Sequence, residues 1–384
     1  MENPELGIYV HIPFCIKKCI YCDFVSYPNK LKEQNLYTDK VIEEIEERKE
    51  RFQKYDVTTI YFGGGTPSCL DSANIIRILN KIYEVIGITN SNKNYKEIET
   101  TIEVNPGTTT KQKLKEYKEA GFNRLSIGLQ SSNNEILKML GRIHTFENFM
   151  QTYKEAREVG FGNINVDIMI GLPNQTVQDI KETIEKVLKL KPEHISAYSL
   201  ILEENTKMTQ LVEQGILQLP DEEMERREYW YMKNKLELAG YKHYEISNFA
   251  KPSMESKHNV NCWNQKEYLG FGVAAHSYEN KIRYSNTINL DEYLQTPNIS
   301  EHKIVQEKQD KIEEEKEFML LGLRKIEGIS VQKFKEKFGE NPIYLFRQEL
   351  EKLVQEDLIE VDLDQIKLTN KGLDFANLVW EEFV

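Results

Sequence analysis

Short apolar runs alternate with longer amphipathic stretches over the first two thirds of the chain. The apolar runs have the length of strands, and the stretches between them repeat apolar residues at helical spacing. The predicted strands are 8–12, 57–62, 98–104, 124–129, 164–170 and 194–200, and the predicted helices are 31–52, 72–86, 111–120, 147–159 and 177–190. Strands that alternate with helices of ten or more residues predict repeated βα units and a parallel sheet.

The number of units indicates how this sheet is closed. Six βα units are too few for a closed eight-fold barrel, so we expect an α/β fold with an open, partial (β/α)6 TIM-like barrel. Functional sites in parallel sheets lie at the carboxyl ends of the strands. The residues that follow the first five predicted strands are Cys15, Gly63, Asn105, Gln130 and Gly171. We therefore expect the chemistry of the protein at this edge of the sheet.

The pattern changes after about residue 205. A long helix is predicted over 221–239, and the stretch 244–272 is rich in aromatic residues and Asn but poor in helical period. From about residue 310, three predicted helices precede two short runs that look like a hairpin, which is typical of an α+β winged-helix-like domain. The predicted division is a core at 1–240, a connecting region at 241–309 and a C-terminal winged-helix-like domain at 310–384.

The charge and composition of the chain limit the binding partners and the cellular location that we expect. The 384 residues carry a net charge of −12, and from Glu301 onward 13 Lys and Arg face 20 Asp and Glu. DNA binding requires neutralisation of phosphates, so we expect no nucleic-acid partner. The N-terminal segment has no basic start or long apolar run, and five cysteines form no disulfide framework. We therefore expect a cytoplasmic protein, and peripheral contact with a membrane stays open.

Three cysteines stand close together directly after the first predicted strand. Cys15, Cys19 and Cys22 fall within eight positions. Three thiolates on one loop can bind three corners of a [4Fe-4S] cluster and leave the fourth iron open to another ligand. The alternatives are three chance cysteines or a zinc site with a borrowed ligand. Zinc sites usually show a second pair of cysteines or histidines, and no such pair is visible.

The arrangement Cys-x3-Cys-x2-Cys, with the aromatic Tyr21 before the last cysteine, resembles the radical S-adenosylmethionine superfamily. The flanking residues Tyr9 and 11–15 (HIPFC) narrow the resemblance to oxygen-independent coproporphyrinogen III oxidase and its relatives. This resemblance covers residues 7–271. It implies a [4Fe-4S] cluster that donates one electron to S-adenosylmethionine and so produces a 5′-deoxyadenosyl radical.

The same resemblance implies a set of S-adenosylmethionine contacts. In the family, the loop at 63–67 (GGGTP) holds the methionine end of the cofactor, and an acid at the end of the third strand binds the ribose. Each of these residues taken alone would be an ordinary loop or strand-end residue. The implied cofactor-binding residues are Tyr9, Tyr21, Gly64, Gly65, Thr66, Glu103, Gln130, Arg142 and Asp167.

Two departures separate the chain from the oxidase. The oxidase usually carries a further cysteine where this chain has Phe24, and it has a long segment before the cysteine motif, whereas fourteen residues precede Cys15 here. Both features resemble the HemW-type haem chaperones. The segment 258–263 (HNVNCW) is similar to the HNxxYW motif of these chaperones, with Cys262 in place of Tyr. His258 is thus a candidate haem ligand, although a single histidine among aromatic residues is often structural.

The resemblance favours a haem chaperone that binds haem, a [4Fe-4S] cluster and S-adenosylmethionine and transfers haem to acceptor proteins. We expect membrane respiratory enzymes among these acceptors and an electron donor for the cluster, while a homo-oligomer stays open. The first alternative is oxygen-independent coproporphyrinogen III oxidase, which decarboxylates its substrate to protoporphyrinogen IX. The second is a radical enzyme that acts on haem itself, for example by ring-opening methylation. No catalytic residue is assigned.

Overall fold

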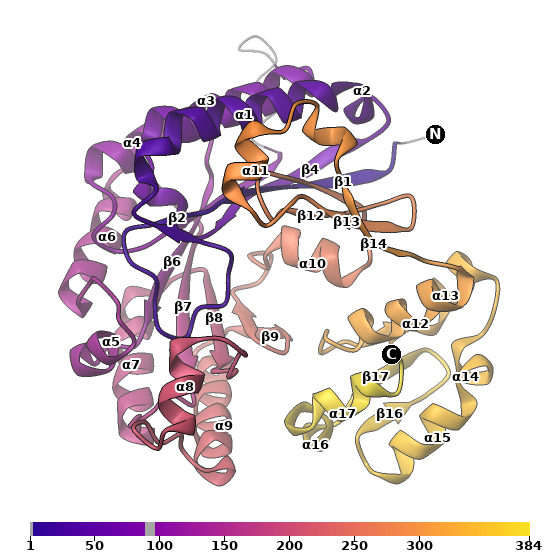
Figure 1. Cartoon of the computed structure of the whole chain (residues 1–384). Coiled ribbons are helices and arrows are strands. Elements are labelled where there is room, and N and C mark those ends of the chain that lie inside the picture. Colours follow the sequence, from indigo (N-terminus) through magenta and orange to yellow (C-terminus); the bar gives the residue numbers. More distant parts are fainter. Residues whose placement is uncertain (1–2, 89–96) are drawn as a thin grey trace.

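The computed structural model describes residues 3–88 and 97–384. Within these residues the main sheet has the strand order β14-β13-β12-β11-β1-β4-β5-β6-β7-β8-β10-β9. Its parallel strands are β1 (Glu5–Ile12), β4 (Asp56–Gly64), β5 (Glu99–Val104), β6 (Arg124–Gln130), β7 (Ile164–Ile170), β8 (His194–Ser199) and β11 (Tyr268–Phe271). The sheet curves but stays open at both edges, which confirms the predicted partial barrel (Figure 1).

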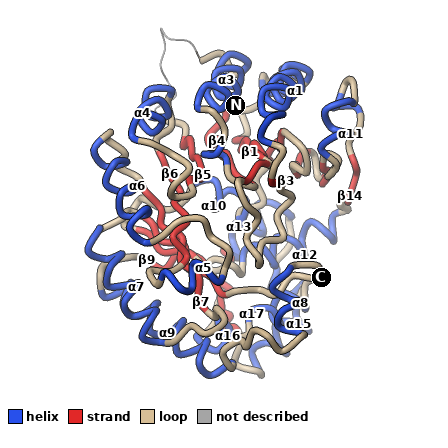
Figure 2. The backbone as a smooth tube through the Cα atoms, turned by 60° about the vertical axis from the view of Figure 1, so that its left-hand side comes forward, coloured by secondary structure: helices blue, strands red, loops and turns tan. Residues whose placement is uncertain are grey.

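Long helices cover the outer face of the curved sheet, and the strands lie inside them (Figure 2). These helices are α1 (Gln34–Glu47), α3 (Ser72–Val85), α4 (Lys111–Ala120), α6 (Phe146–Glu158), α7 (Val177–Leu190) and α9 (Glu222–Leu238). The strands carry near-continuous apolar runs because both of their faces are buried, as is usual for parallel sheets. All seven residues of β6, for example, are buried.

The predicted helix at 31–52 is interrupted in the structure. A 3-10 turn (Leu31–Glu33) precedes α1, and a short helix α2 (Lys49–Phe52) follows it. The break falls at Arg48, which has φ −103° and ψ 6°. Its buried guanidinium pairs with Glu44 at 3.0 Å and donates a hydrogen bond to the Gly270 carbonyl at 3.0 Å, so it points into the core rather than along a solvated helix face.

The region 241–309 contains strands that its sequence pattern does not indicate. A hairpin of β9 (Lys242–Glu245) and β10 (Asn248–Ala250) adds antiparallel to β8, and β11 adds parallel to β1 as a seventh parallel strand. The remaining elements of this region are α10 (Lys257–Trp263), β12 (His276–Glu279), β13 (Ile282–Ser285), α11 (Leu290–Gln295), a 3-10 turn (Ile299–Glu301) and β14 (Ile304–Lys308). The main sheet thus continues to Lys308, while the division at 240 and 310 stays a prediction.

The C-terminal part has its own core and a small sheet of order β15-β17-β16, as expected for a winged-helix-like domain. Phe334, Leu350, Ile366 and Val379 are among its buried residues. Its elements are α12 (Lys311–Gly322), β15 (Ile329–Ser330), α13 (Val331–Phe338), α14 (Pro342–Leu345), α15 (Arg347–Gln355), β16 (Ile359–Val361), β17 (Gln365–Leu368), α16 (Asn370–Asp374) and α17 (Ala376–Glu381). Among the described helices, none is long and apolar enough to cross a bilayer.

Candidate functional site

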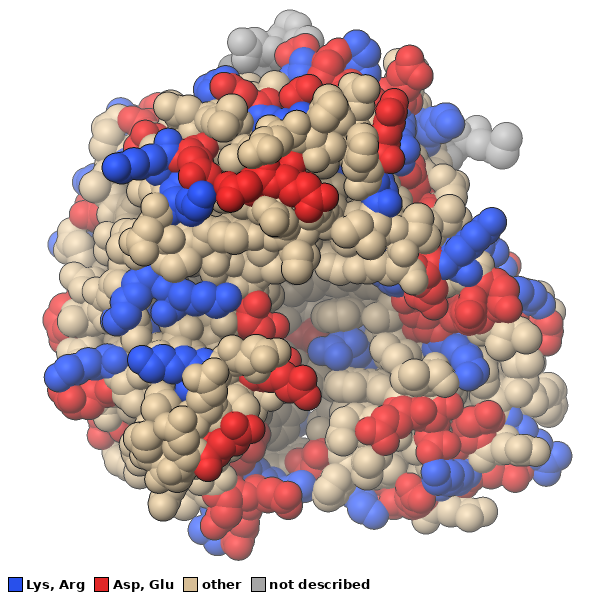
Figure 3. Space-filling model, viewed as in Figure 1, with Lys and Arg blue, Asp and Glu red and all other residues tan. Residues whose placement is uncertain are grey.

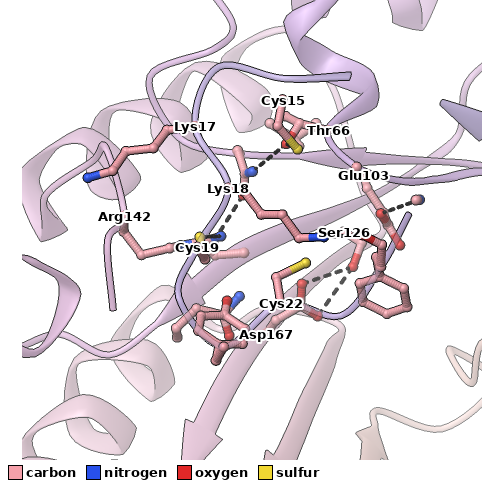
Figure 4. Close-up of a pocket in the computed structure, with 18 of the residues that line it drawn as sticks. Cys15, Lys17, Lys18, Cys19, Cys22, Thr66, Glu103, Ser126, Arg142 and Asp167 are labelled. Atoms are coloured by element: carbon pink, nitrogen blue, oxygen red, sulfur yellow. Dashed lines mark hydrogen bonds between the residues drawn. The ribbon is translucent and has the colours of Figure 1, made fainter. Parts of the chain in front are cut away.

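A cleft of about 740 Å³ opens at the carboxyl ends of the parallel strands. All three clustered cysteines line it, and Figure 4 shows them around one space together with two acids and Arg142. The structure brings almost all of the predicted site residues together here. Those that line the cleft are Cys15, Cys19, Tyr21, Cys22, Gly64, Gly65, Thr66, Glu103, Gln130, Arg142 and Asp167. Neither Tyr9 nor His258 lines this cleft.

The cysteine loop is closed by a short parallel pair of strands, β2 (Phe14–Cys15) and β3 (Tyr27–Pro28). The loop is also tied to the neighbouring helix α5 (Asn134–Met139), because the Ile20 N–H donates to the Leu140 carbonyl at 3.1 Å. The Cys15 sulfur lies 3.4 Å from Thr66 Oγ1. Burial raises the pKa of the Cys15 thiol and raises that of Cys22 to about 11.

The three thiols fit a cluster better than a single ion. No group of three or more His, Cys, Asp or Glu side chains among the described residues is close enough to hold one metal ion. A [4Fe-4S] cluster binds each thiolate to a different iron, so its ligands stand farther apart than those of one ion. Cys15, Cys19 and Cys22 would therefore hold three corners of such a cluster. When bound, it supplies one-electron reduction of a ligand at the remaining iron.

The glycine loop that ends β4 packs directly against the end of β1. Gly64 has φ +112°, and a Cβ built on it would lie 2.5 Å from His11 Cε1. A Cβ on Gly65 would lie 2.8 Å from the Phe14 carbonyl oxygen and 3.1 Å from the Cys15 sulfur. Only glycine allows the backbone to come this close while adopting the positive φ at Gly64. The loop thus presents backbone rather than side chains to the cleft.

His11 supports this loop from behind. Its Nε2 donates to the Val25 carbonyl at 2.9 Å, so Nδ1 accepts from the Tyr9 hydroxyl at 3.0 Å. Burial lowers the pKa of His11 to about 4, which keeps the ring neutral at physiological pH. Tyr9 therefore holds His11, which lies between the glycine loop and the end of the cysteine loop.

Two half-buried acids face the cleft from neighbouring parts of the sheet. Glu103 accepts hydrogen bonds from the Tyr61 hydroxyl at 2.9 Å and from the Gly64 N–H at 3.2 Å. Burial, and then the charge of Asp167, raise the pKa of Glu103 to about 7. Asp167 accepts from Asn165 Nδ2 at 2.6 Å, and burial raises its pKa as well. A cationic or hydroxyl-bearing ligand would stabilise both acids in their charged form.

Arg142 connects the acid side of the cleft to the cysteines. Its Nη2 donates to Asn105 Oδ1 at 3.0 Å and to the Gly128 carbonyl at 2.8 Å, while Nη1 lies 3.7 Å from the Cys19 sulfur. Gln130 follows a bulge in β6 and has φ +69°, and its Oε1 accepts from the Tyr198 hydroxyl at 3.1 Å.

The cleft contains further polar residues that the resemblance did not indicate. Asn105, Ser126 and Tyr198 line it, and Asn105 Nδ2 donates to Thr66 Oγ1 at 2.9 Å. Asn105 follows the third predicted strand, at the edge where the sequence predicts the site, and Tyr198 could have been found in the same way from its place near the end of the predicted strand 194–200. Ser126 could not, because a serine inside an apolar strand carries no signal of its own. Below the cleft, a second chamber of about 1260 Å³ shares Tyr21, Cys22, Phe24, Glu103, Ser126, Asp167 and Tyr198 with it.

The candidate haem ligands lie elsewhere. His258, on α10, is buried with its Nδ1 2.8 Å from Thr59 Oγ1 and its ring stacked on Tyr61. Burial lowers the pKa of His258 to about 4. Cys262, which stands where the chaperone motif has Tyr, lies near the other end of α10 from His258. A haem role of His258 stays a prediction.

Comparison with known proteins agrees with this geometry. Residues 9–187 match the radical SAM superfamily, and residues 309–375 match the HemN C-terminal domain. The haem chaperone HemW of Lactococcus lactis is 36% identical over 389 residues, which cover 100% of this chain and 98% of that protein. HemW of Bacillus subtilis is 36% identical over 382 residues, which cover 98% of each. The structure of coproporphyrinogen III oxidase (HemN) from Escherichia coli superposes with a TM-score of 0.84 at 24% identity, covering 100% of this chain and 90% of that one.

Proposed function

The chain belongs to the HemW family of radical SAM proteins, and we propose that it is a haem chaperone that binds haem and transfers it to acceptor proteins. The observation that carries this proposal is the similarity to HemW proteins over essentially the whole chain, including the C-terminal part. The protein holds a [4Fe-4S] cluster on Cys15, Cys19 and Cys22 and S-adenosylmethionine in the adjoining cleft. The convergence of the cysteines, the glycine loop, Glu103 and Arg142 in one cleft supports both cofactors.

Coproporphyrinogen III oxidase is the alternative, because its structure shares the fold. That similarity is too low in sequence identity to carry an activity. Phe24 also favours the chaperone: it lines the cleft with 61% of its side chain exposed, at the position where the oxidase has a further cysteine. A phenyl ring offers no thiol for a reaction there.

The partners follow from this role. Haem-acceptor proteins, with membrane respiratory enzymes among them, and an electron donor for the cluster are part of the proposal. The cysteines of the described residues are free thiols, in keeping with a cytoplasmic protein that meets its acceptors at the membrane surface. A homo-oligomer would be compatible with the same function.

An anaerobic comparison of two activities tests the proposal. The reconstituted protein is incubated with S-adenosylmethionine, a reductant and coproporphyrinogen III, and separately with haem followed by an apo-cytochrome as acceptor. We expect stoichiometric haem binding, release of unmodified haem to the acceptor and no turnover of the porphyrinogen. Catalytic formation of protoporphyrinogen would refute the chaperone in favour of the oxidase. A modified tetrapyrrole in the haem reaction, detected by mass spectrometry, would instead indicate an enzyme that acts on haem.

A further inference from the structure

A second opening lies between the barrel and the C-terminal domain, where the space-filling view shows the surface hollowed (Figure 3). This interdomain cleft, of about 1310 Å³, is lined on one side by barrel residues and on the other by α16 and α17. Its apolar lining includes Ile201, Tyr229, Ile246, Phe375 and Trp380. A partly apolar cleft with a few polar groups is typical of a site for an organic ligand.

Arg324 lines this cleft and contacts two indole rings. Its guanidinium carbon is 4.4 Å from the centre of the Trp263 ring and 4.6 Å from that of the Trp380 ring. Trp263 is the last residue of the segment 258–263, and Trp380 comes from α17. Both rings lie within cation–π distance of the guanidinium. Such stacking is a preferred environment of arginine, and it restricts the orientation of its donor fork.

The Arg324 guanidinium has no hydrogen-bond or ion-pair partner among the described residues. Arg226, which lines the same cleft, is different because it is paired with Asp374. The nearest acidic influence on Arg324 is Glu245, whose pKa burial raises to about 7. Because the Nε of Arg324 is buried without an acceptor, an anionic ligand would supply the guanidinium with a charged hydrogen bond.

The backbone at Arg324 is fixed in place. The Ile246 N–H donates to the Arg324 carbonyl at 3.1 Å, and the Ile326 N–H donates to the Tyr244 carbonyl at 3.1 Å. These bonds join the β9–β10 hairpin of the barrel to the segment that follows α12. The donor fork is therefore positioned before any ligand arrives, which lowers the entropic cost of binding.

We propose that the interdomain cleft binds haem, with one propionate on the Arg324 guanidinium. This inference rests on the proposed function, because haem is the planar apolar dicarboxylate that such a chaperone must hold. A guanidinium fork fits a carboxylate with two parallel hydrogen bonds, and the apolar lining fits the macrocycle. The cleft also shares Tyr198, Ser199, Ile201 and Ser247 with the chamber below the cysteine site. Haem bound here would lie next to the space that opens to the cluster and S-adenosylmethionine.

Comparison of haem with its dimethyl ester tests this proposal, because esterification removes the carboxylates and leaves the macrocycle intact. Both ligands are titrated by absorbance into the wild-type holoprotein and into R324M, with thermal unfolding and S-adenosylmethionine binding as checks of folding. We expect the wild type to prefer haem over the ester by about tenfold or more, as for a charged hydrogen bond, and R324M to lose most of this preference. R227M is the matched control, since Arg227 is exposed and paired with Glu223 outside the cleft, and its preference should equal that of the wild type.

The other outcomes separate this proposal from the proposed function. Equal affinity of the wild type for haem and ester, or an unchanged preference in R324M, would overturn the carboxylate site while leaving the chaperone intact. Arg124 is a buried arginine that lines the second chamber. A loss of preference confined to R124M would place the haem carboxylate at Arg124 and would also overturn the proposal. Absence of haem binding to the wild type would overturn the proposed function itself. If R324M fails to fold, R324K takes its place, because it keeps the charge but lacks the flat fork, and it should lose part of the preference.

Discussion

The contact between the glycine loop and His11 leads to a sharp prediction for the substitution G64A. An alanine at this position must adopt φ +112°, and its Cβ would lie 2.5 to 2.9 Å from three atoms of the His11 ring. The ring is not free to move away, because both of its nitrogens are hydrogen-bonded, to Tyr9 and to the Val25 carbonyl. Relief of the overlap would therefore shift the glycine loop or break the contact that supports the cysteine loop.

The expected loss in the free energy of unfolding of G64A has two parts, and a matched variant separates them. A positive φ costs an L-residue about 1–2 kcal/mol, and forced overpacking of a buried site adds about 1–3 kcal/mol. Gly160 has φ +95° with nothing within 4 Å of a built Cβ, so G160A carries the first cost alone. We expect G64A to lower the free energy of unfolding by about 2–5 kcal/mol, and G160A by about 1–2 kcal/mol.

Two measurements check this difference. Urea unfolding of both variants gives the free energies, and equilibrium dialysis of the reconstituted proteins gives the affinity for S-adenosylmethionine. The affinity of G64A should fall by about tenfold or more, because its loop carries the N–H that binds Glu103, whereas G160A should bind like the wild type. If the two variants lose equal stability and both keep their affinity, close packing of this loop on His11 does not organise the cleft.

Two further substitutions test the buried charges. Burial raises the pKa of Glu228, which accepts from the Gly171 N–H at 2.9 Å, to about 7, above its unfolded value of 4.5. Between these pH values the folded state therefore keeps a proton that the unfolded state loses, and the contribution of Glu228 to the free energy of unfolding should fall by about 2–3 kcal/mol from pH 4.5 to 7. Urea unfolding at pH 5 and 8 should show that the stability of E228Q relative to the wild type is higher at pH 8. R142K keeps the positive charge, but a lysine cannot contact Asn105, Gly128 and Cys19 at the same time. Equilibrium dialysis should therefore give about tenfold weaker S-adenosylmethionine binding at unchanged iron content. Equal binding would show that only the charge of Arg142 matters.

The parallel part of the fold could be predicted because its signal is local. Each buried strand reads as a short apolar run, and six such runs separated by helical patterns define the βα units without any knowledge of partners. The same rule placed the site, since the residues after the strands meet at one edge of the sheet. Tyr9 is the exception among the implied cofactor residues. It lies within β1, two residues before His11, and contacts that ring rather than the cleft.

The remainder of the sheet could not be predicted because its strands are short and their partners are distant. Tyr268–Phe271 forms β11 by pairing with β12 and with β1, which lies more than 250 residues earlier. A run of four residues is too short for its periodicity to indicate so distant a partner. Burial there depends on Arg48 and Glu44, which join α1 to this strand and look like a solvated pair in the sequence. Charged residues at i and i+4 on a helix are usually exposed, so their spacing in the sequence does not indicate this burial.

The segment 258–263 shows how ligand chemistry and structural position can differ. His258 draws attention because imidazole binds iron, yet its ring stacks on Tyr61, whose hydroxyl donates to Glu103 in the cysteine cleft. Trp263 has no ligand chemistry, but it covers one face of Arg324 in the interdomain cleft. The two residues stand near opposite ends of the seven-residue helix α10, so one short helix contacts the supports of both clefts. A substitution at His258 that changed haem binding would therefore need a spectroscopic change at the iron to count as loss of a ligand, because loss of support alone would weaken binding without one.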